Sequence, residues 1–503
     1  MIPTTLAEMA RVVGGTVHGD GGTTVRGAAT LDSRVVEPEG LFVAVAGEHV
    51  DGHDYAATAR AAGAAATLGS RPVEGPCVVV DDVEHALGLL GAHVAEQLPD
   101  CVVVGITGSQ GKTSTKDLLA QVLEAAGPTV ATRGNLNNEL GVPLTLTRAD
   151  ASTRYLVVEM GARGLGNIAY LCGLARPSVG VVLNVGTAHL GEFGSREVIA
   201  RTKGELVEAL PADGTAVISS DDPVVSAMAA RTSAGVLRFG RGGTADVRAV
   251  DVEVDDQGCP TFTLVHRDQR VPVRLPLLGE HQADNAAAAA AAALAVGLGL
   301  TEIARTLGVV QARSAWRMEH TERADGVAVV NDAYNANPES TRSALRTLST
   351  MVRRRGGRGW AVLGEMRELG DEADAEHADV GRLAAGLGLD VVVVGTGAAA
   401  VATGARSVAD GSHRVVELPD VDAVADWLHG RLTPSDVVLL KASRAVGLER
   451  AASALLDPDR HTAAGAPASR TGRGDDTDEL DHADQPDDAD QPEHVTQDGG
   501  DDR

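Results

Sequence analysis

Lysine is scarce in this chain of 503 residues, and positive charge is in the minority. Only Lys112, Lys116, Lys203 and Lys441 occur, so the other 40 of the 44 basic residues are arginine. Arginine can supply general surface charge, but not a compact ammonium or a modifiable primary amine. The four lysines are therefore candidate functional residues, with chance as the alternative. The formal net charge of −26 argues against sequence-independent nucleic-acid binding, which needs a basic face.

Long apolar runs and paired cysteines are also missing. The longest mostly apolar run, residues 285–300, is largely alanine. It is shorter than the roughly 20 residues that span a membrane, which favours a buried helix. The N-terminus lacks the basic start and apolar stretch of a signal peptide. Cys77, Cys101, Cys172 and Cys259 show no CxxC spacing, which indicates reduced thiols. We expect a cytoplasmic monomer with no membrane span and no nucleic-acid partner.

The length predicts several domains, because one hydrophobic core rarely serves so long a chain. Short apolar strands alternate with helical patterns, which predicts an α/β fold with mainly parallel sheets. From about residue 457 the sequence becomes acidic and nearly free of large apolar residues, so it cannot bury enough surface to order itself. We expect a small α/β domain over 1–97, a central mainly parallel sheet domain over 98–308, a Rossmann-like domain over 309–457 and a disordered acidic tail over 458–503.

The strongest chemical motif is a glycine-rich turn between a predicted strand at 101–107 and a predicted helix at 113–126. Such a turn lets backbone N–H groups surround phosphate oxygens, and the helix N-terminus adds partial positive charge. The lysine reaches the β- and γ-phosphates, and the next hydroxyl can ligate Mg²⁺. The upstream glycine, Gly105, is one residue too early for the strict pattern, so we predict a variant P-loop rather than an incidental turn. Its residues are Gly108, Ser109, Gln110, Gly111, Lys112, Thr113 and Ser114.

Two later strand ends extend this predicted site. Glu159 ends a predicted strand at 155–159, where parallel sheets bind ligands, and it could hold a nucleotide-bound Mg²⁺. A structural or solvated glutamate is the alternative. His189 follows the next strand, and thirteen intervening residues separate it from Lys203. The P-loop, Glu159 and His189 follow consecutive strands of one predicted sheet, so we expect them to converge on one face.

Six motifs together resemble the Mur ligases: GSQGKTS, GNLNNELGVPLTL, VVEMGA, NVGTAHLGEFGS, NDAYNANPES and LGEMRELG. The run over 31–64 is similar to the family's UDP-binding domain, and the resemblance covers roughly residues 15–455. YNANP combined with GNLNNE is most similar to the members that add D-alanyl-D-alanine to UDP-N-acetylmuramoyl-tripeptide. The resemblance implies a three-domain enzyme in which a UDP-binding domain precedes a P-loop ATPase domain and a C-terminal domain for nucleotide and D-Ala-D-Ala.

The resemblance also implies an activity. ATP and two Mg²⁺ ions would drive the ligation through an acyl phosphate, giving UDP-N-acetylmuramoyl-pentapeptide, ADP and phosphate for peptidoglycan synthesis. Both meso-diaminopimelate and lysine fit as the third residue of the tripeptide. Lys112 and Thr113 match the phosphate-binding lysine and first-metal hydroxyl, Glu159 a first-metal carboxylate, and His189 a second-metal ligand. Lys203 matches a lysine that is often carbamylated and associated with metal. The implied catalytic residues are Lys112, His189 and Lys203.

The remaining roles are implied by position within the matching motifs. Arg317 stands in Ala-Trp-Arg-Met, where the family usually has Gly-Arg, so the guanidinium is kept and the turn glycine is not. Lys441 lies in Lys-Ala-Ser-Arg, where the family usually has Lys-Gly-Ser-Arg. The nucleotide-contacting candidates are Arg317, Asp332, Tyr334, Asn335 and Asn337. The substrate candidates are Ser33, Arg34, Asp51, Gly52 and His53 for the UDP-sugar, Asn135, Asn137 and Asn138 for nucleotide and substrate, and Glu365, Glu368, Ser443 and Arg444 for the dipeptide.

Two other functions use many of the same motifs. A folylpolyglutamate synthetase or a sister Mur ligase would also activate a carboxylate with ATP. A P-loop regulatory switch would hydrolyse nucleotide slowly and independently of D-Ala-D-Ala. The segments DSR and DGHD favour a UDP-muramoyl substrate over that of a folylpolyglutamate synthetase, and LNNE with YNANP favours the D-Ala-D-Ala step over that of a sister Mur ligase.

Deletion of residues 458–503 should leave ligase activity unchanged, because a segment that cannot bury apolar surface adds nothing to a folded core. The measurement compares the turnover of the truncated and full-length chains. A large loss would instead indicate that the tail is an interaction segment.

Overall fold

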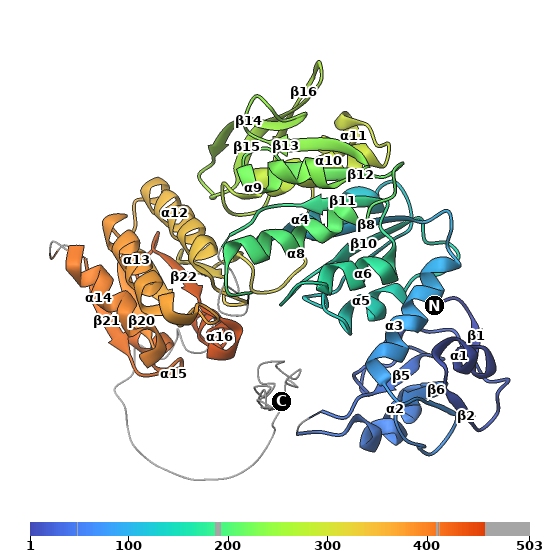
Figure 1. Ribbon diagram of the computed structural model, residues 1–503. Coiled ribbons are helices and arrows are strands. Elements are labelled where there is room, and N and C mark those ends of the chain that lie inside the picture. The colour runs from blue at the N-terminus through green and yellow to red at the C-terminus, as the bar shows by residue number, and fades with distance from the viewer. Residues whose placement is uncertain (48, 187–192, 409–410, 412, 458–503) are drawn as a thin grey trace, which may run out of the picture.

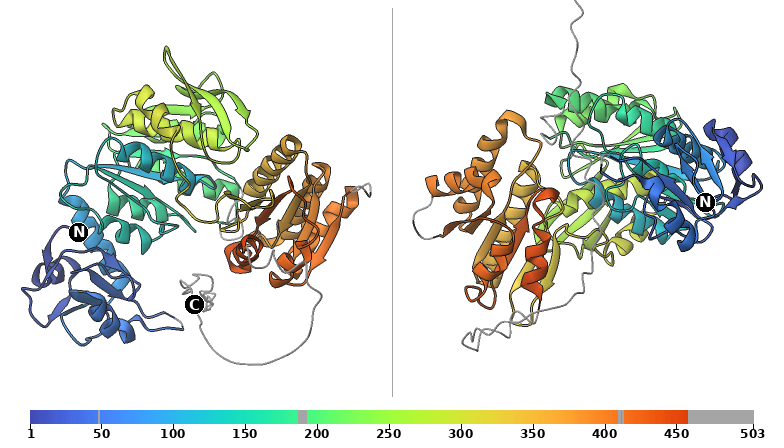
Figure 2. Two further views of the ribbon diagram at one scale, coloured as in Figure 1. Left: turned by 180° about the vertical axis from the view of Figure 1, so that it is seen from behind. Right: turned by 90° about the horizontal axis from the view of Figure 1, so that it is seen from below.

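The computed structural model describes residues 1–47, 49–186, 193–408, 411 and 413–457. The expected tail at 458–503 and the candidate His189 lie outside these ranges. Three α/β parts follow one another along the chain, which we name the N-terminal part (residues 1–96), the central part (residues 102–307) and the C-terminal part (residues 319–456). The N-terminal and C-terminal parts adjoin the central part at opposite ends of the molecule (Figures 1 and 2).

The N-terminal part is built on a small sheet in the order β2-β7-β6-β5-β4. Strands β4 to β7 run parallel, β2 pairs antiparallel with β7, and β1 pairs with β3. The elements are β1 (Thr4–Thr5), α1 (Leu6–Val13), β2 (Thr16–His18), β3 (Thr24–Val25), β4 (Ala29–Thr30), β5 (Leu41–Ala44), η1 (Gly52–Tyr55), α2 (Ala56–Ala62), β6 (Ala66–Gly69), β7 (Cys77–Val79) and α3 (Val83–Glu96).

The central part is built on a nine-stranded sheet in the order β16-β15-β14-β13-β12-β11-β8-β10-β9. It is parallel from β9 to β14 and antiparallel from β14 to β16. The elements are β8 (Val102–Thr107), α4 (Lys112–Glu124), β9 (Thr129–Ala131), α5 (Gly141–Leu146), β10 (Tyr155–Glu159), α6 (Asn167–Ala175), β11 (Val179–Val182), α8 (Arg196–Glu208), β12 (Thr215–Ser219), α9 (Pro223–Ser226), η2 (Ala227–Arg231), β13 (Gly235–Gly240), β14 (Val247–Val254), β15 (Pro260–His266), β16 (Gln269–Arg274), α10 (Gln282–Ala295) and α11 (Leu300–Leu307).

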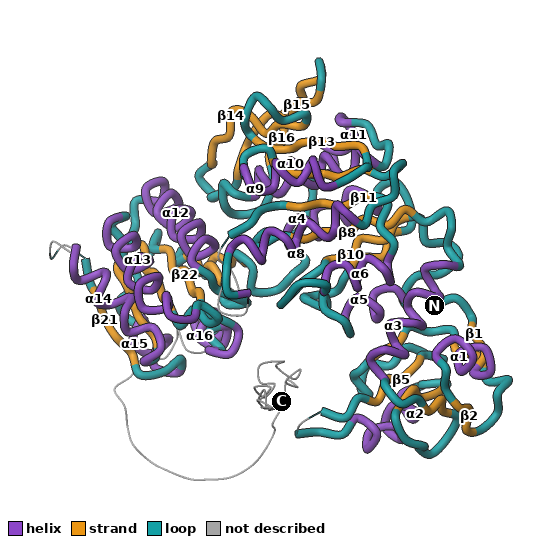
Figure 3. The backbone as a smooth tube through the Cα atoms, viewed as in Figure 1, coloured by secondary structure: helices purple, strands orange, loops and turns teal. Residues whose placement is uncertain are grey.

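The C-terminal part has a six-stranded sheet in the order β17-β18-β22-β19-β20-β21, parallel except for β17. Helices cover both faces of its strands (Figure 3), and a separate apolar core fills each face. The elements are β17 (Glu319–Glu322), β18 (Ala328–Asn331), α12 (Pro338–Arg355), β19 (Gly359–Leu363), η3 (Gly370–Glu372), α13 (Ala373–Gly386), β20 (Asp390–Val394), η4 (Thr396–Ala398), α14 (Ala399–Val408), β21 (Val415–Leu418), α15 (Asp422–Leu428), β22 (Val437–Lys441), η5 (Arg444–Val446) and α16 (Glu449–Leu456).

The α/β class and the mainly parallel sheets expected from the sequence are confirmed. The alanine run lies in α10, and its alanine side chains are buried, as the composition of the run predicts. The antiparallel hairpin of β15 and β16 was not anticipated; one side of β16 faces solvent, so its sequence mixes arginine with valine. No helix among the described residues is long and apolar enough to cross a membrane.

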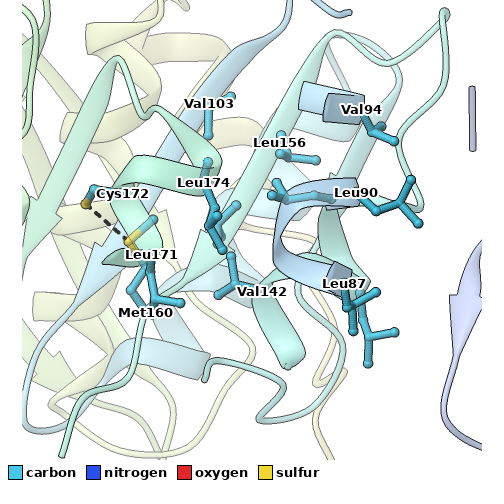
Figure 4. Close-up of a cluster of buried hydrophobic side chains, with 14 of the residues drawn as sticks. Leu87, Leu90, Val94, Val103, Val142, Leu156, Met160, Leu171, Cys172 and Leu174 are labelled. Atoms are coloured by element: carbon cyan, nitrogen blue, oxygen red, sulfur yellow. Dashed lines mark hydrogen bonds between the residues drawn. The ribbon is translucent and has the colours of Figure 1, made fainter. Parts of the chain in front are cut away.

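Helix α3 joins the N-terminal and central parts through one shared core. Leu87 and Leu90 of α3 face Val142 of α5 and Leu174 of α6 (Figure 4). In the same core, the Cys172 thiol donates to the Met160 sulfur at 3.8 Å. Because the core is continuous here, the domain limits expected from the sequence stay predictions.

Replacing Leu90 with alanine should lower the free energy of unfolding by about 2–5 kcal/mol, because it leaves a cavity in a fully buried core. Denaturant titration measures the change. The matched control is His85→Ala on the exposed side of the same helix, which should change stability by less than about 0.5 kcal/mol. Equal effects of the two substitutions would contradict the shared core.

Candidate active site

A glycine-rich turn connects β8 to α4, as expected for a P-loop. The first residue of the helix is Lys112, and Gly111 precedes it as the N-cap with a left-handed φ of 80°. A Cβ atom at Gly111 would lie 2.6 Å from the Asn285 Oδ1 atom. Glycine is therefore required here both by conformation and by space.

The turn is held in place by the segment that follows β11. The Gln110 N–H donates to Asn184 Oδ1 at 3.0 Å, and Asn184 Nδ2 donates to the Gln110 carbonyl at 3.1 Å. The Gly186 N–H donates to Ser109 Oγ at 2.9 Å. These bonds lock the phosphate-binding backbone before any ligand arrives, which lowers the cost of binding.

Two lysine ammonium groups face this turn from different helices. Lys112 Nζ donates to the Gly108 carbonyl at 2.9 Å. Burial lowers the pKa of Lys112, while the nearby Glu159 carboxylate opposes this shift. Lys203 of α8 is 4% exposed, and its ammonium makes no hydrogen bond or ion pair with another described residue. Burial and the charge of Lys112 hold the pKa of Lys203 well below its ordinary value.

Glu159 ends β10 and is 1% exposed. Its Oε1 atom accepts a hydrogen bond from Asn137 Nδ2 at 2.7 Å. Its Oε2 atom is buried without a hydrogen-bond partner among the described residues. Such an atom is costly to bury unless a cation or donor satisfies it.

Oxygen donors near Glu159 fit a hard divalent cation. The buried Thr113 hydroxyl lies on the first turn of α4 and lines the same cavity as Glu159. The described residues contain no cluster of three or more His, Cys, Asp or Glu side chains that could hold a metal. A metal at this point would therefore need phosphate oxygens and water in addition, as Mg²⁺ in nucleotide sites commonly does.

The C-terminal part supplies the facing wall. Lys441 is the last residue of β22. Its Nζ atom forms an ion pair with Asp332 Oδ2 at 2.6 Å and donates to the Asn335 carbonyl at 2.9 Å. The other Asp332 oxygen, Oδ1, accepts from the Met318 N–H at 3.1 Å. Asp332 thus ties the interdomain segment before β17 to the end of β22.

The turn around Arg317 forms without the glycine that the family usually has there. Trp316 and Met318 both adopt left-handed backbone, with φ values of 58° and 51°. Such a conformation costs a bulky residue roughly 1–3 kcal/mol. The Arg444 guanidinium lies 4.2 Å from the Trp316 ring centroid, and that of Arg317 lies 4.1 Å from the Tyr334 ring. These cation–π contacts offset part of the strain.

A cavity of about 1240 Å³ lies between the central and C-terminal parts and brings most of the candidates together. It is large enough for a nucleotide and a second molecule. The predicted residues that line it are Ser109, Gln110, Gly111, Lys112, Thr113, Ser114, Asn135, Asn137, Asn138, Glu159, Lys203, Arg317, Asp332, Tyr334, Asn335, Asn337, Glu365, Glu368 and Lys441.

Four cavity-lining residues around the start of α10 were missed: His281, Gln282, Asp284 and Asn285. Asn285 Nδ2 donates to Gln282 Oε1 at 2.9 Å, and the Thr115 hydroxyl donates to Asn285 Oδ1 at 3.4 Å. His281 Nδ1 lies 3.0 Å from Ser343 Oγ of α12, so the central and C-terminal parts are in direct contact at this point of the lining. The available signal was a polar cluster, HQADN, directly before the alanine run.

The candidates for the UDP-sugar lie elsewhere, in the N-terminal part. Arg34 forms an ion pair with Asp32 at 2.9 Å. Asp51 caps η1, which begins at Gly52. The pKa of the Asp51 carboxyl is held below its usual range by hydrogen bonds from the backbone N–H and the ring of His53 and from Arg71. The roles of Ser33, Arg34, Asp51, Gly52 and His53 stay predictions.

His53 is buried and both of its ring nitrogens are engaged. Its Nε2 atom accepts from the Ser70 N–H at 2.9 Å, and its Nδ1 atom lies 2.5 Å from Asp51 Oδ1. The ring proton must therefore sit on Nδ1. This arrangement fits His53 for holding Asp51 in place.

The dipeptide candidates Ser443 and Arg444 lie just outside the cavity lining. Ser443 Oγ accepts from the Arg367 N–H at 2.9 Å, and Arg444 forms an ion pair with Glu449 at 2.5 Å. Their proposed roles are not tested by these contacts.

The P-loop sheet, the facing C-terminal sheet and the small N-terminal domain define an ATP-dependent ligase architecture, and the chain belongs to the Mur ligase family. The family model described as the Mur ligase middle domain matches residues 106–293. The Mur ligase, glutamate ligase domain, matches residues 316–444, and the Mur ligase family, catalytic domain, matches residues 28–94.

Curated relatives are similar over most of their length. The UDP-N-acetylmuramoyl-tripeptide–D-alanyl-D-alanine ligase of Mycobacterium tuberculosis (strain ATCC 25618 / H37Rv) is 46% identical, covering 91% of this chain and 99% of the relative. The ligase of the same name from Escherichia coli (strain K12) is 38% identical, covering 78% and 86%.

Solved structures agree with these sequence relatives. A crystal structure of MurF from Acinetobacter baumannii superposes with a TM-score of 0.79 at 33% identity, covering 90% of this chain and 99% of that one. MurF ligase from Thermotoga maritima, in complex with ADP, gives a TM-score of 0.72 at 31% identity, covering 85% and 96%.

Proposed function

We propose that the chain joins D-alanyl-D-alanine to UDP-N-acetylmuramoyl-tripeptide at the expense of ATP, giving the pentapeptide, ADP and phosphate. The 46% identity to ligases of that name over nearly their whole length supports this substrate pair. The structural observation that best supports the proposal is one cavity, which Lys112, Glu159 and Lys203 line together with residues of the C-terminal part. The product is a precursor of peptidoglycan.

The nucleotide binds with its phosphates on the P-loop. A second cavity of about 300 Å³ adjoins the larger one and shares Ser114, Gln282, Arg317 and Met318 with it. We place the adenine base of the nucleotide in this smaller cavity and its phosphate chain along the start of α4. The Thermotoga maritima neighbour was solved with ADP, which supports the use of an adenine nucleotide.

Mg²⁺ fits at Glu159 and Thr113, because the unpartnered Glu159 Oε2 atom needs a cation. When bound, the metal offsets charge on the transferring phosphoryl group. We assign a second ion to His189 and a carbamylated Lys203. The lowered pKa of Lys203 favours the neutral amine that reacts with CO₂, and the resulting carbamate would be an anionic oxygen donor.

The reaction then proceeds by carboxylate activation. One oxygen of the tripeptide carboxylate attacks the γ-phosphorus, and the bond from that phosphorus to ADP breaks. The amine of D-Ala-D-Ala attacks the carbonyl carbon of the acyl phosphate, and the tetrahedral intermediate loses phosphate and a proton. Lys112 offsets charge on the phosphoryl group, while the locked P-loop holds it in line with the attacking oxygen.

The substrate ends are assigned by position. Ser33, Arg34 and the loop over 51–53 hold the UDP-sugar, and Asn137 and Asn138 lie between them and the reacting carboxylate. Glu365, Ser443 and Arg444 hold the incoming dipeptide. We further propose that the enzyme works in the cytoplasm as a monomer, with domain limits at 97/98, 308/309 and 457/458. The left-handed residues at 316 and 318 mark the segment about which the C-terminal domain closes to exclude water.

Phosphate release from Mg-ATP should require both UDP-N-acetylmuramoyl-tripeptide and D-Ala-D-Ala, because the acyl phosphate forms only on the bound tripeptide and turns over only with the amine. A coupled phosphate assay and mass measurement of the product test this together. The product should be heavier by the dipeptide less water. Phosphate release that depends on neither substrate would still indicate a nucleotide site, but it would contradict the assignment of these two substrates.

Replacing Lys203 with arginine should lower kcat by roughly 100-fold or more, because arginine stays cationic and cannot form the carbamate. The activity of the enzyme that keeps Lys203 should fall when dissolved CO₂ is removed and should return when bicarbonate is added. The variant should ignore bicarbonate. A Lys203→Arg variant of normal activity would contradict the carbamate.

A further inference from the structure

The proposed mechanism uses neither Lys441, which lines the cavity, nor Lys116. Lys116 lies on α4 and its side chain is 3% exposed. It does not line the cavity. Lysine is seldom buried this fully unless its ammonium is paired and hydrogen-bonded.

The Lys116 ammonium is held between a carboxylate and a backbone carbonyl. It forms an ion pair with Asp117 Oδ1 at 2.5 Å and donates to the Thr132 carbonyl at 2.8 Å. Thr132 follows β9, the edge strand of the central sheet. Among the described residues no strand pairs with the outer side of β9 to supply donors, and Lys116 supplies one. The other Asp117 oxygen accepts from the Ser314 hydroxyl at 2.6 Å, which fixes the carboxylate from its far side.

Thr132 is in turn bonded to the metal-site glutamate. Its Oγ1 atom accepts from the Glu159 N–H at 3.0 Å, and its own N–H donates to the Val157 carbonyl at 3.0 Å. Thr132 is 2% exposed. The end of β10 is therefore positioned by Thr132 through the backbone and by Asn137 through the carboxylate.

The same helix carries Thr113, one turn before Lys116. The two oxygen donors assigned to the metal, Thr113 and Glu159, come from different elements, and the contact from Lys116 to Thr132 ties those elements together. We infer that Lys116 is a positioning residue for the metal site, fixing Glu159 relative to Thr113 through Thr132. This inference rests on the proposed function, because it takes Glu159 as a metal-binding carboxylate.

A lysine that merely stabilised the fold would affect melting and leave metal affinity unchanged. The test therefore measures Mn²⁺ binding to the full-length enzyme with ADP, by titration of the free-ion electron paramagnetic resonance signal. Two substitutions interrupt the connection at different points: Lys116→Met removes the ammonium, and Thr132→Val removes the hydroxyl but keeps the shape. Thr132→Ser restores the hydroxyl.

We expect Lys116→Met and Thr132→Val each to weaken Mn²⁺ binding by about ten-fold, as loss of groups that orient metal ligands commonly does. Thr132→Ser should bind within two-fold of the unsubstituted enzyme. The control Val122→Ala removes buried volume from the same helix; it should lower the melting temperature and leave Mn²⁺ affinity unchanged. The Thr132 pair decides the matter if Lys116→Met does not fold.

Unchanged Mn²⁺ affinity in a folded Lys116→Met variant or in Thr132→Val, or equal weakening in Val122→Ala, overturns the inference while the proposed function stands. If the unsubstituted enzyme with ADP binds no Mn²⁺, the metal site of the proposed function fails and the inference fails with it. Weakening in Thr132→Val that Thr132→Ser reverses supports a positioning role.

Discussion

The organisation of the site depends on one electrostatic constraint, the burial of the Glu159 carboxylate near Lys112, with Lys203 buried in the lining of the same cavity. One oxygen of Glu159 is bonded to Asn137, while the other has no partner in the described residues. Lys203 is buried with no counter-ion among the described residues, and the charge of Lys112 further disfavours its protonation. The site therefore buries polar groups that have no partner among the described residues, which is costly unless an ion or a ligand satisfies them.

The sheet topology explains how this constraint is met. Strands β8, β10 and β11 are neighbours in one parallel sheet, so the loops at their carboxyl ends meet at one edge. Asn184 then fastens the P-loop to the loop after β11. The opposite wall comes from a different sheet, where Asp332 and Lys441 join the ends of β18 and β22. A ligand in the cavity contacts both sheets, so its binding couples the two parts of the enzyme.

Local sequence patterns were sufficient for the features that lie within one segment. The P-loop could be predicted because strand, glycine turn and helix are contiguous, and Glu159 because it ends a β-branched run. Contacts between distant segments could not be predicted: the clamp by Asn184 and the polar cluster beginning at His281 depend on how strands and helices pack. The absence of glycine near Arg317 did not predict that Trp316 adopts a left-handed backbone. The strain of that conformation is offset by the contact of Trp316 with Arg444, a residue distant in the sequence. None of the four lysines is exposed, so none of them simply supplies surface charge, while their functional roles stay predictions.

The central claim is that this site activates a carboxylate by phosphorylating it. The most direct measurement follows oxygen from UDP-N-acetylmuramoyl-tripeptide labelled with ¹⁸O in its reacting carboxylate. Attack on the γ-phosphorus leaves one carboxylate oxygen bound to phosphorus when the amide forms. Mass analysis of the released phosphate should therefore show one ¹⁸O atom per turnover. Phosphate free of label would show that the carboxylate never bonds to phosphorus and would contradict the account.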